Sequence, residues 1–182
     1  MMFAIVDEMI KTQEKFAELK KLYFFEHVIF SYQWWFLIFV TVFVWIVWAI
    51  LVDKKNLNRI LLVGLFTSLT AVVLDDIGLS LVFWFYPYQI AFFTNQLYSV
   101  DIAIIPVFYM LLYQYRTTWV SYLLTLVLLL LFAVIVAEPL FAKMDIYMLI
   151  RWEHLYSIPF YMLIGIFVKW LVDRLVKNND TF

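Results

Sequence analysis

Residues 34–52 form one apolar segment that contains no charged side chain. An α-helix of this length rises about 30 Å, which matches the hydrocarbon core of a bilayer. Tryptophans toward both ends of the segment, such as Trp34 and Trp48, are typical of the interface between lipid and water. The segment therefore predicts a membrane-spanning helix, and the rest of the chain has to fold beside lipid.

Four further apolar segments follow it. They cover approximately residues 60–84, 99–115, 119–137 and 154–171. The pair Glu138-Pro139 is expected to stop the fourth segment, because proline disfavours helical backbone at the residue before it. The sequence thus predicts about five transmembrane helices between residues 27 and 172.

The composition of the whole chain agrees with a membrane protein. Hydrophobic residues make up 66% of the 182 residues and charged residues 15%, whereas soluble domains carry about 45–50% and about 25%. We therefore expect an all-α integral membrane protein in the cell membrane. Its parts are an N-terminal helix at residues 1–26, a five-helix transmembrane domain at 27–172 and a polar C-terminal tail at 173–182.

The N-terminal helix has an amphipathic pattern. Met2, Met9, Phe16 and Tyr23 recur every seven residues, and charged residues lie between them. Such a helix presents one apolar face. We expect this face to lie on the membrane surface. The alternative is that it pairs with a helix of a partner.

Lysine and arginine predict how the chain is oriented in the membrane, because they accumulate on the cytoplasmic side. One set of turns and helix ends holds Lys54, Lys55, Arg59, Arg116, Lys169, Arg174 and Lys177. This set predicts a cytoplasmic C-terminus and an N-terminus outside. Four lysines within residues 1–26 oppose this orientation.

Acidic and histidine side chains converge on one leaflet in either orientation of the chain in the membrane. Candidates for binding an ion or a proton are Asp75, Asp76, Asp101, Glu138 and His154, and secondary candidates are His27, Glu153, Ser157 and Tyr161. A charge at mid-bilayer costs about 2.5–3.5 kcal/mol on insertion scales, so its presence favours a functional role. The alternative is structural: such acids bond to Tyr, Trp or backbone, or lie at the interface.

Other classes of function have less support. The net charge of −1 gives no reason to expect nucleic acid binding, and the absence of cysteine removes thiolate chemistry. We expect a polar, acidic pocket in the outer leaflet that binds or passes protons or divalent cations, as a transporter or channel subunit. One alternative is a non-catalytic subunit, associated with copies of itself or with another membrane protein. A second is a membrane-embedded enzyme for a lipid-linked substrate, whose catalytic residues the sequence does not identify.

Six short strings occur in a characteristic order. They are VIFSYQWW at 28–35, LDDIG at 74–78, WFYPY at 84–88, PVFYM at 106–110, EPLF at 138–141 and WEHLYSIP at 152–159. In this order they resemble a family of small multi-spanning membrane proteins from Bacillus- and Clostridium-like bacteria, over residues 27–172. The resemblance implies a helical fold in a bacterial membrane, and it implies no activity.

Overall fold

The structure, a computed structural model, describes residues 2–179 and is almost entirely helical. The α-helices are α1 Met2–Tyr23, α2 Tyr32–Leu51, α3 Leu57–Ser80, α4 Ile105–Tyr115, α5 Trp119–Phe132, α6 Glu138–Lys143 and α7 Ser157–Asn179. Shorter turns are η1 Phe24–Val28, η2 Lys54–Asn56, η3 Val100–Ile104, η4 Ala133–Ala137 and η5 His154–Tyr156. Two short strands, β1 Trp84–Phe85 and β2 Met148–Leu149, pair antiparallel, with Trp84 opposite Leu149 and Phe85 opposite Met148.

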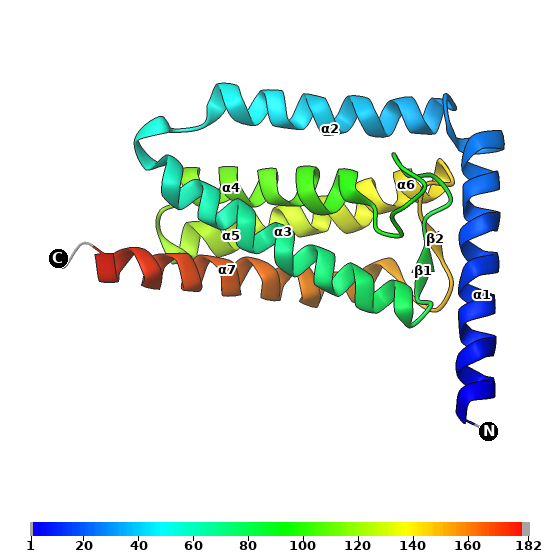
Figure 1. The fold of residues 1–182 in the computed structure, drawn as a ribbon. Helices are drawn as coiled ribbons and strands as arrows, with labels where there is room; N and C mark the ends of the chain where they lie inside the picture. Colours follow the sequence, from blue (N-terminus) through cyan, green and yellow to red (C-terminus); the bar gives the residue numbers. More distant parts are fainter. Residues whose placement is uncertain (1, 180–182) are drawn as a thin grey trace.

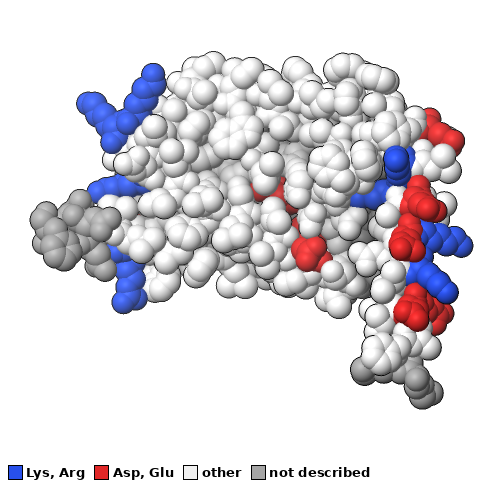
Figure 2. Space-filling view, in the orientation of Figure 1, with Lys and Arg blue, Asp and Glu red and all other residues white. Residues whose placement is uncertain are grey.

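Helices α2 to α7 run along a common direction and form a bundle, while α1 lies across one end of it (Figure 1). We call this end the α1 end and the other the opposite end. The charged residues follow the same division, because a broad uncharged belt separates the charges of α1 from Lys and Arg at the opposite end (Figure 2). Within this otherwise uncharged belt, Asp or Glu residues are visible at two places.

The prediction of an all-α fold is confirmed, and four helical segments are long and apolar enough to cross a membrane. They are Tyr32–Leu51, Lys54–Ser80, Trp119–Lys143 and His154–Val176. The remaining expected span is a shorter apolar helix, Val100–Tyr115. Helix α7 also continues to Asn179, so the segment expected to be a polar tail is helical from residue 173 to that point.

The core of the bundle lies where α3 meets α4 and α7. Small residues of α3, including Gly64, Ala71 and Gly78, are buried on the side that faces these helices. The sequence places them on one stripe, and small side chains let neighbouring helices approach closely. Helix α2 is peripheral, since only Gln33 and Leu37 of its residues are buried.

The expectation that Glu138-Pro139 ends a helix was wrong. The chain stays helical from Trp119 to Lys143, passing through the π-helical turn η4 just before the proline. In this turn the Glu138 N–H donates to the carbonyl of Ala133, five residues back. The wider turn changes the hydrogen-bond register where the proline lacks an N–H group, so the helix continues.

A second π-helical turn, η3, precedes Pro106 in the same way. Ile105, the residue after this turn, donates its N–H to the carbonyl of Val100, again five residues back. π-helical turns occur frequently at functional sites. Here they carry two of the candidate acids, because Asp101 belongs to η3 and Glu138 directly follows η4.

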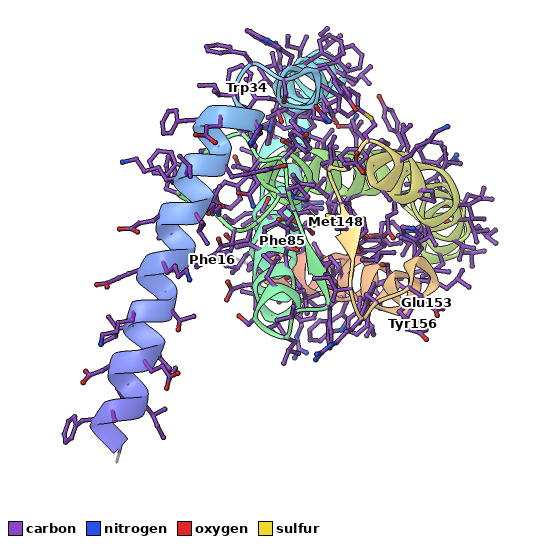
Figure 3. The ribbon with its side chains drawn as sticks, turned by 90° about the vertical axis from the view of Figure 1, so that its right-hand side faces the viewer. Phe16, Trp34, Phe85, Met148, Glu153 and Tyr156 are labelled. Atoms are coloured by element: carbon purple, nitrogen blue, oxygen red, sulfur yellow. The ribbon has the colours of Figure 1, made fainter. Side chains whose placement is uncertain are left out.

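Helix α1 contacts the bundle through its last two turns. Lys20 donates to the carbonyl oxygen of Thr94 and to Oδ1 of Asn95, the latter at 2.6 Å. The Tyr23 ring lies 6.5 Å from the Tyr88 ring, measured between centroids. Lys20 lies one helical turn after Phe16, so the apolar side of α1 faces the bundle (Figure 3). Partial burial lowers the pKa of Lys20 to about 8.

Candidate functional site

A cavity of about 450 Å³ lies inside the bundle near the α1 end. Helices α3, α4, α5 and α7 supply most of its wall, with apolar side chains such as Leu74, Ile105, Leu130 and Ile164. The polar atoms that reach this wall come from carboxyl, phenol, indole and hydroxyl groups. No Lys or Arg is among the described residues that line it.

One side of the cavity carries two acids from neighbouring helices. Asp75 of α3 and Asp101 of η3 are both buried, with 6% and 5% of their surface exposed. Their carboxyl groups lie within hydrogen-bonding reach of each other. Oδ1 of Asp75 accepts hydrogen bonds from the Trp84 indole at 2.8 Å and the Tyr86 hydroxyl at 2.7 Å. The backbone N–H of Leu97 also approaches Asp75.

The Oδ2 atoms of Asp75 and Asp101 are both buried, and neither accepts a hydrogen bond from any described residue. Ionised carboxylates only accept hydrogen bonds, so two of them cannot bond to each other without a proton. A buried acceptor that finds no donor costs about 1–3 kcal/mol. The geometry of this pair therefore calls for a proton or another cation.

A second polar group lies on the other side of the cavity. Oε1 of Glu138 accepts a hydrogen bond from the Tyr161 hydroxyl at 2.9 Å, and Oε2 lies 2.8 Å from Nδ1 of His154. The His154 side chain is 27% exposed and that of Glu138 10%. Ser157 completes the group, since its Oγ accepts from the Trp152 indole at 3.2 Å. These contacts link the surface to the cavity through His154 and Glu138.

Aromatic side chains close the cavity toward the α1 end. We call this layer the aromatic roof; its members are Phe83, Trp84, Tyr86, Tyr147 and Trp152, all of which line the cavity. The rings of Phe83 and Trp152 stack with centroids 5.2 Å apart, and those of Tyr86 and Tyr147 at 5.6 Å. The paired strands hold the roof together from outside, where Phe85 and Met148 lie side by side (Figure 3).

The phenols of the roof are strong candidates for hydrogen-bond donors. Burial raises the pKa of Tyr86 well above its usual value, and the nearby Asp75 and Asp101 raise it further. Burial likewise raises the pKa of Tyr147, with added effects from Glu138 and Asp75. Both hydroxyls therefore keep their protons at neutral pH. Tyr147 is close enough to acids on both sides of the cavity to feel their electrostatic effect.

Local backbone features bring the roof over Asp75. The chain reverses after α3 through Val82, whose φ of 55° is rare for residues other than glycine. This turn returns the Trp84 ring to the surface of Gly78, where any side-chain carbon would collide with the ring. Gly78 lies three residues after Asp75 on the same side of α3, so the indole N–H reaches the carboxylate.

Both loops that build the roof contain a residue with positive φ. Besides Val82, Asp145 in the turn before β2 has a φ of 58°. Such backbone is strained for residues other than glycine. These two turns fix the directions in which the chain enters β1 and β2.

Most of the predicted site residues meet at this cavity. Asp75, Asp101, Glu138, Ser157 and Tyr161 line it. His154 contacts it through Glu138. The structure therefore brings together acids that are far apart in the sequence.

Three predicted residues lie elsewhere. Asp76 is exposed on α3, and its Oδ1 accepts a hydrogen bond from the Gln96 amide at 3.0 Å. His27 is exposed in η1, 3.8 Å from Glu26. Glu153 is exposed at the start of η5, on the outer surface of the α1 end (Figure 3). None of the three lines the cavity.

The sequence pattern did not predict the aromatic roof. Its members come from two loops, and neither loop has a helical or strand period that would mark an inward side. Aromatic density at residues 83–88 was the available signal. As for metals, no three His, Asp or Glu side chains between residues 2 and 179 come close enough together to hold an ion.

A buried cation at the opposite end provides a contrast. Lys169 is only 3% exposed, lies 3.2 Å from Asp173 and sits over the ring of Tyr113. The Tyr113 hydroxyl donates to Asp173 at 2.8 Å. This charge therefore has partners, as a structural ion pair requires, whereas Asp75 and Asp101 have no cationic partner among the residues lining the cavity.

No family model, curated protein or solved structure matches this chain. The resemblance suggested by the six sequence strings thus stays a prediction. The chemistry of the site has to be inferred from its own residues and their geometry.

Proposed function

We propose that this chain is a multi-pass membrane protein that holds a proton between Asp75 and Asp101 and exchanges it for a cation in the cavity. The apolar helices and the uncharged belt support a membrane location. Arginine and lysine at the opposite end support a cytoplasmic position for that end, with α1 lying in the outer interface.

The observation that carries this proposal is the pair of buried Oδ2 atoms without donors. With a single proton between them, one of the two aspartates is a protonated carboxyl group that donates a hydrogen bond, and the other is a carboxylate that accepts it. It also removes one of two like charges from an apolar site, where both together would be costly. A cation that enters the cavity can take over this role.

Glu138 and His154 provide the route for the proton. His154 is partly exposed, and an imidazole ring can take up a proton at one nitrogen and release one from the other. It contacts Glu138, which lines the same cavity as the two aspartates. We propose that protons pass between solvent and cavity along this contact.

A monovalent cation suits the site better than a divalent one. Mg²⁺ and Ca²⁺ take about six or more oxygen ligands, and the Asp75–Asp101 pair supplies few. An enzyme acting on lipid-linked substrates and a non-catalytic subunit are the remaining alternatives.

Infrared spectroscopy of the full chain in lipid nanodiscs tests the proton. A protonated carboxyl has a C=O stretching band separate from that of a carboxylate. We expect this band in the unmodified protein at pH 7, with a clear loss in Asp101→Asn. Asp76→Asn is the matched control, because Asp76 is next to Asp75 in the sequence but its side chain is exposed. A spectrum without the band, or one that Asp101→Asn leaves unchanged, would overturn the proposal.

A further inference from the structure

We infer that the exchanged cation is an amphipathic, monovalent organic cation, bound beneath the aromatic roof. This inference rests on the proposed function and names its ligand class. The cavity volume of about 450 Å³ lies within the roughly 300–1,000 Å³ typical of sites for drug-sized ligands. It is far larger than an inorganic monovalent ion requires.

The charge of the cavity selects a cation. Its titratable lining groups are Asp75, Asp101, Glu138, Tyr86, Tyr109, Tyr147 and Tyr161, and no Lys or Arg is among them. An anion would meet carboxylates in an apolar environment with no counter-charge. The unpaired Oδ2 atoms of Asp75 and Asp101 are independent evidence, because they are buried acceptors in the wall of the cavity.

The aromatic roof favours an organic cation. Trp84 and Trp152 present π-systems within the lining, and their rings contact each other with centroids 5.2 Å apart. Cations with a delocalised or shielded charge are attracted to the faces of such rings. Small hydrated ions would have to lose their water shell against a wall that is mostly apolar.

Access from the lipid side favours an amphipathic ligand. Several lining residues are also on the outer surface of the bundle: Leu81 is 52% exposed, Phe132 54% and Phe160 42%. They come from the end of α3, from α5 and from α7. A ligand dissolved in the outer leaflet can therefore approach the cavity between helices without crossing the roof.

Charge balance sets the exchange ratio. When a monovalent cation occupies the cavity, the proton between Asp75 and Asp101 leaves and the net charge of the site is unchanged. No covalent bond forms or breaks in this step apart from the O–H bond of the carboxyl group. The proton passes to solvent by way of Glu138 and His154.

Tetraphenylphosphonium is a suitable probe, because it is a monovalent aromatic cation that enters lipid. Titration of the full chain in weakly buffered nanodiscs should show saturable binding with about one proton released per cation. Tetraphenylborate, an anion of similar size and shape, should not bind saturably. This comparison uses the unmodified protein, so it does not depend on whether a variant folds.

Two variants and one control locate the binding. Asp101→Asn should weaken binding roughly tenfold or more and abolish proton release, and Asp76→Asn should change neither. Trp152→Leu should weaken binding roughly tenfold while leaving the infrared carboxyl band in place. That variant separates the roof from the proton, since the Trp152 indole bonds Ser157 and not an aspartate.

The outcomes distinguish the two proposals. A carboxyl band without saturable tetraphenylphosphonium binding overturns the ligand class and leaves the proton site standing. Equal binding of the cation and the anion, or binding without proton release, also overturns the ligand class, because partition into lipid would explain it. A missing carboxyl band overturns the proposed function itself.

Discussion

Trp84 donates its indole N–H to Asp75 across the surface of Gly78, at a distance of 2.8 Å. The donor lies in a loop after α3 and the acceptor within that helix. Their contact therefore ties the roof of the cavity to its buried carboxyl pair. It depends on a glycine between them, because a side-chain carbon at Gly78 would occupy the space of the indole ring.

Gly78→Ala should displace Trp84 and break its hydrogen bond to Asp75. Overpacking of this kind costs about 1–3 kcal/mol. We expect a lower unfolding midpoint and a changed indole fluorescence. Gly64→Ala is the control, because its new side chain meets only the flexible end of Met110. Equal losses of stability in the two variants would contradict the role assigned to Gly78.

Tyr161→Phe should leave Oε1 of Glu138 without its 2.9 Å hydrogen bond. Loss of one such bond to a buried acceptor costs about 1–3 kcal/mol. Unfolding by denaturant in mixed micelles measures this difference. Tyr156→Phe is the matched control, since that ring is exposed at the α1 end (Figure 3). If both variants are as stable as the parent, Tyr161 does not hold Glu138.

The docking of α1 should strengthen as pH rises above about 8. The pKa of Lys20 is about 8 in the folded protein and 10.5 unperturbed. As pH rises, Lys20 therefore loses its proton in the docked state before it does so in the undocked state. Rising pH favours docking until the undocked lysine also deprotonates, near pH 10.5. Below pH 8 both states are protonated and docking is at its weakest.

Hydrogen exchange of the last turns of α1 measures this pH effect, after correction for intrinsic exchange rates. Lys20→Met should remove the dependence. Lys21→Met should retain it, because Lys21 is exposed. Protection that stays constant between pH 8 and 10.5 in the parent would show that Lys20 is solvated as an ordinary lysine.

Helix α1 should lie in the lipid–water interface with one side in lipid. The chain has no cysteine, so single-cysteine variants carry one spin label each. Labels at Met9 and Phe16 should be more accessible to oxygen, which concentrates in lipid, and labels at Lys11 and Glu18 to a water-soluble nickel complex. Equal accessibility at all four positions would indicate a helix surrounded by water.

Local pattern was enough to predict the helices. The charge-free run at 34–52 and the seven-residue repeat of apolar residues in α1 are local features of the sequence. Helical periodicity assigns each residue of such a pattern to one side of the helix. The sequence did not predict that the helix continues past Pro139, because the π-helical turn before this proline depends on how the surrounding helix packs. The same turn places Glu138 in the cavity wall.

The sequence by itself determined that this chain is helical, apolar along most of its length and equipped with acids toward one end of the bundle. Only the tertiary structure decided which acids meet: Asp75 turns inward and joins Asp101, while Asp76 turns outward to Gln96. Adjacent residues on a helix point about 100° apart, and the packing of α3 against α4 selects which one is buried. The roof likewise exists only because two distant loops pair through β1 and β2.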